Sequence, residues 1–305
     1  MSHAADAEIV GVNWGSSNFR AWRIAGDGSM VDEIAAATGV AALSRDGMVE
    51  TIAMLAARWP DHGPIYASGM IGSNIGWVEA PYAIAPAGVA DLARAAIPVE
   101  IAGRRVRIVP GIACRRAFDD APDILRGEEI ELLGLMERAP GDGIAALPGT
   151  HTKWVRHEAG CVGEFLTAMS GEIFDRLTAQ GLLASIVEGD AAEGPAFQDG
   201  VARGRAGGLG LSSLLFGARA RVIRGDLTRA DAASYIRGLL IGAEIADALT
   251  AFPEMRERVV PLIGNGPLSR LYAAALGAVG IEAMLVESRL ACLLGFRALH
   301  RASLE

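Results

Sequence analysis

The chain has 305 residues, more than a single hydrophobic core usually holds, so we expect two domains or one large α/β domain. Hydrophobic residues make up 51% and charged residues 21%, which excludes a disordered or collagen-like chain. The formal net charge of -8 argues against partners such as nucleic acid or an anionic membrane. No apolar run reaches the roughly 20 residues of a membrane-spanning helix.

The cysteines and the N-terminus indicate the compartment. Cys114, Cys161 and Cys292 lie far apart and form no CxxC pair, which favours reduced thiols over disulfides or a zinc site. Residues 1–8 lack the basic and apolar regions of a secretory signal. We therefore expect a soluble cytoplasmic protein.

The first part of the chain reads as short apolar strands followed by helices. Alternating and continuous apolar runs predict the strands, and apolar residues at helical spacing predict the helices. A turn of small residues at 15–18 should join the first two strands as a hairpin. The predicted segments are strands at 8–14, 20–25 and 28–36, a helix at 46–58, strands at 64–68 and 106–109, and a helix at 128–138.

A similar order begins again after the turn formers at 140–143. The predicted segments there are strands at 144–147, 153–157, 161–168 and 259–263, a helix at 268–278, a strand at 283–286 and a helix at 289–300, with further helices after 168. Two successive halves of this kind indicate an internal duplication. We expect domains at 1–139 and 140–305, and the last helix can pack back on the first domain.

The first hairpin turn could cradle phosphate oxygens. Gly15 lets a ligand approach the backbone closely, and Ser16 and Ser17 add hydroxyl groups after Asn13. The alternative is an ordinary hairpin turn with solvated serines. The stretch 148–153 repeats the theme in the second half, with Gly149, Thr150 and His151. Two such turns at equivalent places would face each other across a cleft that fits a triphosphate.

Lys153 ends the second turn and is the only lysine among 28 basic residues. A GC-rich codon bias explains the arginines but not why this lysine remains. A compact ammonium group suits phosphate oxygens. Lys153 is therefore a candidate catalytic cation, although the codon bias alone leaves its role open.

Two further stretches are candidates for the same site. Glu128 and Glu129 open the helix at 128–138, where a carboxylate is favoured by the helix dipole, either as ordinary first-turn acids or as a base or magnesium-water ligand. The turn at Gly264, Asn265 and Gly266 follows a buried strand and could lie under a purine. The P-loop and Rossmann glycine patterns are absent, which disfavours those nucleotide-binding architectures.

Several motifs in order resemble those of the 2-dehydro-3-deoxygalactonokinase family, and the match runs from about residue 9 to about residue 299. The motifs are Asn13-Trp14-Gly15-Ser16-Ser17-Asn18-Phe19-Arg20, Gly69-Met70-Ile71-Gly72-Ser73, Arg126-Gly127-Glu128-Glu129, Leu147-Pro148-Gly149-Thr150-His151-Thr152-Lys153-Trp154, Met169-Ser170-Gly171-Glu172 and Gly238-Leu239-Leu240-Ile241-Gly242-Ala243-Glu244.

The resemblance implies an α/β fold of two ribonuclease-H-like domains in the actin-like ATPase superfold, with ATP in a central cleft. It implies phosphorylation of the terminal hydroxyl of 2-dehydro-3-deoxy-D-galactonate in galactonate breakdown. By similarity, Glu128 is the candidate base, with Glu129 second. The turn at Gly15 and the turn at Gly149 and Thr150 would hold the phosphates, and the Gly264 loop would hold adenosine.

The remaining expectations concern the metal and the acceptor. Mg²⁺ would be held through water by Glu128 and by Asn13, where the superfold usually has an aspartate. That departure leaves open a catalytically impaired sugar-acid-binding regulator of the same fold. The acceptor's carboxylate needs N–H groups or a cation, for which the candidates are Arg20, Gly72, Ser73 and Arg126, with Trp77 and Tyr82 as walls. A kinase for an epimeric acid and a homodimer also remain open.

Overall fold

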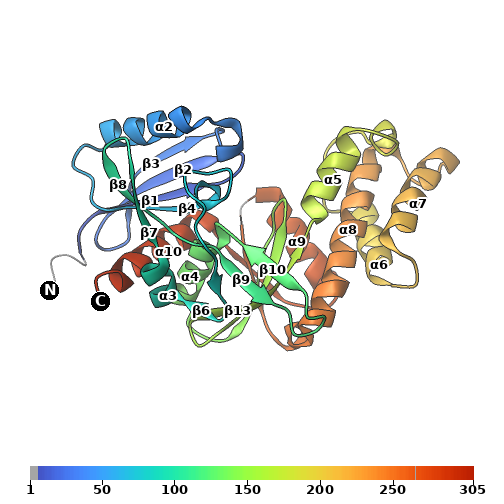
Figure 1. Ribbon diagram of the computed structural model, residues 1–305. Helices are drawn as coiled ribbons and strands as arrows, with labels where there is room; N and C mark the ends of the chain where they lie inside the picture. Colours follow the sequence, from blue (N-terminus) through green and yellow to red (C-terminus); the bar gives the residue numbers. More distant parts are fainter. Residues whose placement is uncertain (1–5, 265) are drawn as a thin grey trace. The chain divides into compact units, whose positions relative to one another are not determined.

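The computed structural model describes residues 6–264 and 266–305, which fall into two compact units (Figure 1). The first unit comprises the chain up to Asp142, together with His157–Glu164 and Ser288–Glu305. The second comprises Gly143–Arg156 and Phe165–Glu287. The division of roles between domains 1–139 and 140–305 stays a prediction.

A six-stranded sheet organises the first unit, in the order β3-β2-β1-β4-β8-β7. The central strand β1 pairs antiparallel with β2 and parallel with β4, and β4 pairs parallel with β8. The bounds are Ile9–Trp14 for β1, Phe19–Ile24 for β2, Met30–Ala36 for β3, Ile65–Gly69 for β4, Ile97–Ile101 for β7 and Arg104–Ile108 for β8.

Successive residues of β1 point to opposite faces of this sheet. Val10 and Val12 pack with residues of α2 (Arg45–Arg58) in one hydrophobic cluster. Gly11 faces α10 (Ser288–Ala302), where an added Cβ would lie 2.3 Å from the Phe296 ring. The glycine therefore lets α10 lie directly against the sheet, and Asn13 shares that face.

Helix α10 also packs against α4 (Glu128–Arg138) through small residues. A Cβ on Gly134 would lie 1.8 Å from the Ala291 carbonyl oxygen, and one on Gly295 would lie 1.9 Å from that of Ile130. Because no side chain separates the two helices at these points, their backbones approach closely and hold the start of α4 beside the start of α10.

Shorter elements complete the first unit. A three-stranded sheet in the order β10-β9-β5 stands apart from the main sheet, and β6 pairs with Cys161 and Val162 of β13. The elements are η1 (Val40–Ala42), η2 (Met70–Gly72), β5 (Ala83–Ile84), β6 (Ala87–Gly88), α3 (Val89–Ala95), β9 (Ile112–Arg115) and β10 (Pro122–Leu125).

The second unit repeats the strand order of the first. Its strands run β13-β12-β11-β14-β15, so in both units the first strand lies between the second and the fourth. Strand β14 pairs parallel with β11 and with β15. The bounds are Gly143–Leu147 for β11, Thr152–Glu158 for β12, Cys161–Ala168 for β13, Val260–Ile263 for β14 and Ala283–Val286 for β15. This shared order agrees with the predicted duplication.

Helices fill the second unit between β13 and β14 and after β14 (Figure 1). The longest, α8, packs against α6, and glycines on both helices allow the close approach: a Cβ on Gly238 would lie 2.2 Å from the Phe197 carbonyl oxygen. The elements are α5 (Ser170–Ala179), η3 (Ala184–Ile186), α6 (Pro195–Arg205), α7 (Leu211–Arg224), α8 (Arg229–Ala251), η4 (Pro253–Glu257) and α9 (Gly266–Ala278).

Every strand and helix predicted from the sequence by its range is present, with boundaries that differ by at most two residues. Several short elements were not predicted, namely β5, β6, β7, β9, β10 and α3. No helix among residues 6–264 and 266–305 combines the length and hydrophobicity that crossing a membrane would require.

Candidate functional site

The first hairpin turn is fixed by backbone hydrogen bonds. The Gly15 N–H donates to the Asn18 carbonyl, and the Gly15 and Ser16 carbonyls accept from Val40 and Ala41 of η1. Both hydroxyl-bearing residues, Ser16 and Ser17, are exposed. The turn therefore has a set backbone shape and leaves its hydroxyl groups at the surface.

Asn13, Arg20 and Ser68 lie side by side at the carboxyl end of β1. The β1–β2 register pairs Asn13 with Arg20, and the β1–β4 register pairs Asn13 with Ser68. The Asn13 Nδ2 points at Cys292 Sγ of α10, 4.0 Å away. The Ser68 hydroxyl is buried and has no hydrogen-bond partner among the described residues. Polar groups of three neighbouring elements thus gather on the α10 face of the sheet.

Gly127 is the N-cap of α4 and brings this helix to the same edge. Its φ of 109° is a left-handed conformation that favours glycine. A Cβ there would lie 3.4 Å from the Cα of Gly69, whose own φ is 94° and which pairs with Trp14 at the end of β1. Two glycines with positive φ therefore place the first turn of α4 beside the first hairpin turn.

Glu128 and Glu129 differ in exposure although they are adjacent. Glu128 is half-buried, and its Oε2 accepts from the Arg126 N–H at 2.9 Å. Glu129 is 0% exposed; its Oε2 accepts from the Gly127 N–H, and its Oε1 is without a hydrogen-bond partner among the described residues. Burial raises the pKa of Glu129 to about 8, and the neighbouring Glu128 charge adds to the rise. Glu128 is the one with access to solvent.

A third acid of the same turn, Glu131, was not singled out from the sequence. Its Oε1 accepts a hydrogen bond from the hydroxyl of Ser288 at the start of α10. Burial raises its pKa to about 7, while the Ser288 hydrogen bond and the Arg20 charge oppose the rise. The spacing of three residues from Glu128 was the available sequence signal, because it places both on one side of α4.

Arg126 anchors the loop between η2 and β5. Its Nη2 donates to the Ala80 carbonyl at 2.8 Å, and its guanidinium carbon lies 4.2 Å from the centre of the Tyr82 ring. Its Nη1 is buried without a hydrogen-bond partner among the described residues, and a Cβ on Gly72 would lie 2.9 Å from it. A cation with one donor free beside Gly72 and Tyr82 suits a carboxylate.

The rest of that loop is more self-contained than the sequence indicated. Four N–H groups, those of Ser73, Gly76, Trp77 and Ala80, donate to carbonyls within the loop. The Ser73 hydroxyl is buried and donates to the Met70 carbonyl. Trp77 lies against Arg45, with 3.7 Å between the guanidinium carbon and the ring centre. These N–H groups are used to shape the loop.

The second turn is held from beneath. The Gly149 N–H donates to the Thr152 hydroxyl at 3.4 Å, and that hydroxyl lies 2.8 Å from the hydroxyl of Tyr272 in α9. The start of α5 closes over the turn, because the Glu172 N–H donates to the Thr150 carbonyl. Thr150 and His151 remain exposed, and His151 Nε2 lies 2.7 Å from Glu172 Oε2.

Lys153 is buried, with 6% of its surface exposed. Its Nζ donates to the Thr167 hydroxyl of β13 at 2.8 Å. The Lys153 side chain therefore lies against the neighbouring strand β13, and its ammonium group is not at the solvent-exposed surface.

The Gly264 loop adjoins the second turn within the second unit. A Cβ on Gly264 would lie 2.6 Å from the Ser269 hydroxyl of α9 and 3.9 Å from the Pro148 carbonyl oxygen. Gly266, with a φ of 73°, begins α9. Asn265 lies outside the described residues. The stretch predicted to bind the phosphates, 148–153, and the loop predicted to bind adenosine, at Gly264, therefore lie next to each other near the start of α9.

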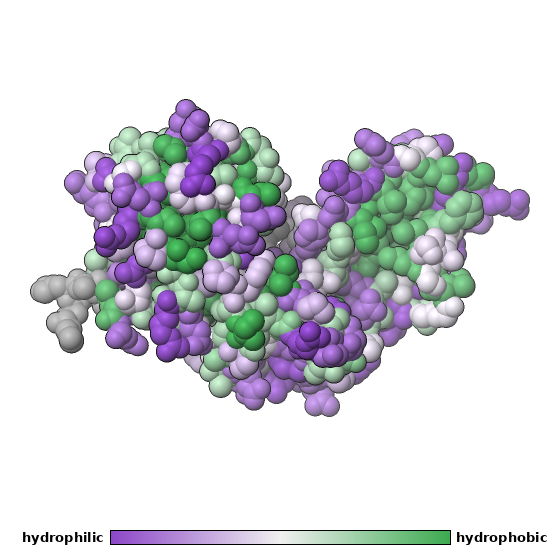
Figure 2. Space-filling view, in the orientation of Figure 1, coloured by the Kyte–Doolittle hydropathy of each residue, from purple (hydrophilic) through white to green (hydrophobic). Residues whose placement is uncertain are grey.

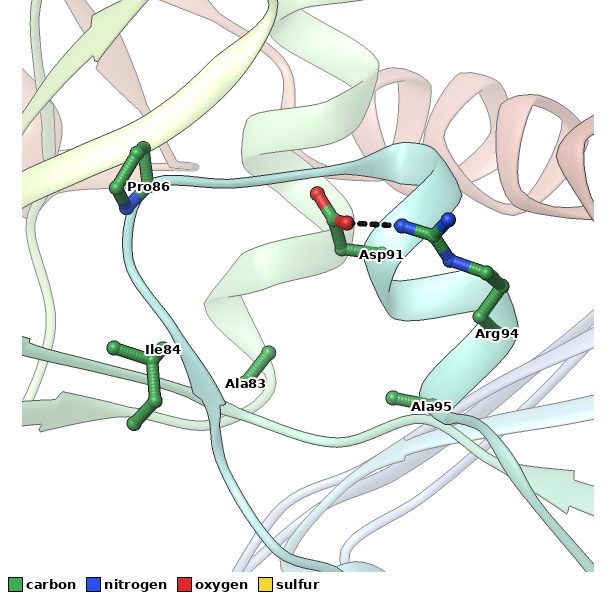
Figure 3. A pocket seen from close by; sticks show the side chains of 6 residues that line it. All are labelled: Ala83, Ile84, Pro86, Asp91, Arg94 and Ala95. Carbon is green, nitrogen blue, oxygen red and sulfur yellow. Dashed lines mark hydrogen bonds and ion pairs between the residues drawn. The ribbon is translucent and has the colours of Figure 1, made fainter.

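One pocket of about 440 Å³ in the first unit involves none of the predicted site residues (Figure 3). Asp91 and Arg94 point toward each other and form an ion pair at its rim, while Ile84 and Pro86 lie on the other side. Asp91 also accepts from the Gly88 N–H. Because its charges satisfy each other and cap α3, this pocket offers little to an anionic substrate.

Comparison with solved structures identifies the fold. A crystal structure from Sinorhizobium meliloti, assigned as a 2-dehydro-3-deoxygalactonokinase, superposes with a TM-score of 0.88 at 36% identity, covering 96% of this chain and 98% of that one. Component A of the (R)-2-hydroxyglutaryl-CoA dehydratase of Acidaminococcus fermentans has a TM-score of 0.55 at 10% identity, covering 98% and 100%. The predicted α/β fold of the actin-like ATPase class is confirmed.

The names of proteins with similar sequences agree with this structural match. A protein of Rhizobium meliloti (strain 1021), named probable 2-dehydro-3-deoxygalactonokinase, is 37% identical over 297 residues, covering 95% of this chain and 96% of the relative. The 2-dehydro-3-deoxygalactonokinase of Escherichia coli (strain K12) is 30% identical over 300 residues, covering 97% and 98%. A family model described as 2-keto-3-deoxy-galactonokinase matches residues 13–299. The chain therefore belongs to the 2-keto-3-deoxy-galactonokinase family, as the sequence motifs indicated.

Proposed function

We propose that this protein is an ATP-dependent kinase that phosphorylates the terminal hydroxyl of 2-dehydro-3-deoxy-D-galactonate. The observation that carries the proposal is the full-length match to relatives named for this activity, at 30–37% identity over at least 95% of the chain. The polar turns described above support it, because their backbones are fixed by hydrogen bonds and they carry hydroxyl groups that suit phosphate oxygens.

Phosphoryl transfer depends mainly on alignment and charge neutralisation, because its transition state is loose. We assign the turn with Gly15, Ser16 and Ser17, and the turn with Gly149 and Thr150, to the phosphates of ATP. The fixed backbone of the first turn supports this role, since its shape does not have to form on binding. Lys153 would offset the charge that develops on the transferred phosphoryl group.

The adenosine end of ATP is assigned to the loop that follows β14. Gly264 and Gly266 flank Asn265 there, and α9 begins with Gly266. Bare backbone suits a flat purine ring, and His151 beside Glu172 could contact phosphate oxygens from the adjoining turn. The proximity of Gly264 to Pro148 supports one nucleotide serving both stretches of the second unit.

Glu128 remains our candidate for the base. A base must reach the acceptor hydroxyl, and Glu128 has solvent access whereas Glu129 is 0% exposed. With its pKa raised to about 8 by burial, Glu129 carries a proton at neutral pH, which disfavours it as a proton acceptor. Glu129 fits a second role, as the buried acid that fixes Gly127.

The donor set fits a magnesium ion carried by ATP. No group of three acidic, histidine or cysteine side chains within residues 6–264 and 266–305 could form a metal cage. Mg²⁺ in such enzymes needs only one or two protein oxygens besides water and phosphates. The carboxylate of Glu128 and the amide oxygen of Asn13 are hard oxygen donors of that kind, and the ion would neutralise phosphate charge.

The acceptor's carboxylate is assigned to Arg126. Its Nη1, which is buried without a hydrogen-bond partner among the described residues, supports this role, and Gly72 lets the guanidinium lie directly against the backbone of the loop. Tyr82 would form a wall for the sugar carbons, with Trp77 and Ser73 shaping the same loop. Arg20, exposed on β2, is the alternative cation.

The test is ADP formation by the purified protein. We expect turnover that requires both Mg²⁺ and the keto-deoxy acid, and no turnover with any six-carbon sugar acid would remove the proposal. The epimeric acid serves as the discriminating substrate, because one inverted hydroxyl decides between the two kinases. Nothing in the comparisons supports the alternative of a regulator without activity.

We propose a cytoplasmic homodimer as the working form. The surface of helix α7 and the loop before it supports self-association, since Leu209, Phe216 and Ile223 expose more than 60% of their surface. Figure 2 shows hydrophobic residues gathered over the helical part of the second unit. Sedimentation of the protein and of Phe216→Ser tests this: a monomer at micromolar concentration contradicts the homodimer.

A further inference from the structure

A buried polar network lies beneath the second turn and has no part in the roles assigned above. Its centre is Glu244 of α8, 4% exposed, from one of the motifs found in the sequence. The Glu244 carboxylate accepts from Trp154 Nε1 at 2.7 Å, from the Tyr272 hydroxyl at 2.9 Å and from the Ser170 hydroxyl. Four elements, β12, α5, α8 and α9, therefore meet at one carboxylate.

The network reaches the turn through one hydroxyl. Tyr272 is 1% exposed, and its hydroxyl also lies 2.8 Å from the hydroxyl of Thr152. Thr152 in turn accepts from the Gly149 N–H. A continuous path of hydrogen bonds thus runs from Glu244 through Tyr272 and Thr152 to the backbone of Gly149.

The same network fixes what lies over the turn. Ser170 is the first residue of α5, and a Cβ on the next residue, Gly171, would lie 2.3 Å from the Gly149 carbonyl oxygen. The start of α5 therefore rests directly on the turn, and Glu244 holds it there through Ser170. Helix α9, which carries Tyr272, also carries Ser269 beside Gly264.

We propose that Tyr272 and Glu244 are positioning residues, which set the Gly149–Thr152 backbone in the shape that receives the phosphates of ATP. The inference rests on the proposed function for the role of the turn. The geometry accounts for the carboxylate in this core: a single carboxylate can accept three donors at once, and an amide cannot. Buried networks of this kind specify one arrangement when every member is satisfied.

The experiment removes the bridging hydroxyl with little change in shape. Tyr272→Phe and Thr152→Val each delete one end of the same hydrogen bond, and Tyr235→Phe is the matched control. Tyr235 is equally buried, at 3% exposed in α8, and lies outside the network. The readouts are the Kd of a non-hydrolysable ATP analogue by calorimetry, the KM for ATP and for the sugar acid, and the melting temperature.

We expect Tyr272→Phe and Thr152→Val each to weaken analogue binding by about 3- to 30-fold, the range for one buried hydrogen bond. The double variant should lose less than the sum of the two single ones, because both remove the hydrogen bond between Tyr272 and Thr152. The KM for the sugar acid should stay within about two-fold, and Tyr235→Phe should match the wild type in every readout.

A network that serves stability alone predicts a different pattern. Tyr272→Phe would then lower the melting temperature and leave the Kd of the analogue unchanged, and that result overturns the proposal. A wild-type protein that binds no analogue overturns it as well. Because calorimetry needs no turnover, it tests the positioning role of Tyr272 and Glu244 separately from the proposed sugar-acid substrate. Shifted analogue binding in a protein inactive on every sugar acid would refute the proposed substrate and keep the positioning role.

Discussion

The burial of Glu129 predicts a stability that falls as the pH rises. The carboxyl lies in the first turn of α4 with one oxygen lacking a hydrogen-bond partner among the described residues, and its pKa in the folded protein is about 8. Glu129→Gln keeps the size of the side chain and an oxygen that accepts from Gly127, but it cannot ionise. The substitution therefore isolates the effect of one titrating proton.

The magnitude follows from the difference between the two states. In the unfolded chain the carboxyl titrates near its ordinary pKa of 4.5, whereas the folded protein retains the proton up to about 8. Between these values the folded state binds more protons, so the free energy of unfolding decreases by about 1.4 kcal/mol per pH unit. From pH 4.5 to 7 the wild type loses about 3 kcal/mol that Glu129→Gln keeps.

Urea unfolding at a series of pH values from 5 to 8.5 measures this difference. We expect the wild-type curve to fall more steeply than that of Glu129→Gln, and the two to converge at low pH. Glu50→Gln, an exposed acid on α2, is the control and should follow the wild type. Parallel curves for the wild type and Glu129→Gln across the whole range would refute the reasoning.

Three predictions concern activity. Lys153→Met should lower kcat by about 100-fold or more with little change in melting temperature, because a charge that neutralises the transition state is lost. Arg156→Gln on the same strand is the control. If Lys153→Met leaves kcat unchanged, the lysine is a product of codon bias. Glu128→Gln should lower kcat far more than it changes the Kd of an ATP analogue, and if only Glu129→Gln does so, the base is misassigned. If the wild type is active, Asn13→Asp should lower the Mg²⁺ concentration that gives half of the maximal rate. If the wild type is inactive and Asn13→Asp restores activity, the regulator is favoured.

Much of the fold was predictable because its main strands and helices carry local signals. Residues 128–138 show apolar residues at helical spacing after a glycine, and α4 has these bounds. Strands β5 and β6 have two residues each and exist only through their partners in β9 and β13, so no local pattern marks them. Helix α3 depends on Asp91 capping Gly88, which a short helical pattern does not reveal.

The candidate site was predictable where it consists of turns and less so where it depends on distant contacts. The small residues of 15–17 and 148–150 are visible as turns in the sequence. Other features of the site depend on residues far apart in the sequence. Asn13 and Cys292 are 279 positions apart, and Thr152 and Tyr272 are 120 positions apart. The burial of Glu129 likewise comes from the packing of α4 and is not visible in its local sequence. Such pairs arise from how helices pack on sheets, which residue spacing alone does not encode.

Helix α10 has a consequence for how the protein is made. The sheet of the first unit is complete in sequence by Ile108, yet the helix that covers Gly11 and lies against Gly134 consists of residues 288–302. During translation, that face of β1 and of α4 must stay uncovered until the ribosome has added residues 288–302. A segment made much later therefore covers β1 and α4, and a nascent chain released before residue 288 would expose this surface to chaperones or aggregation.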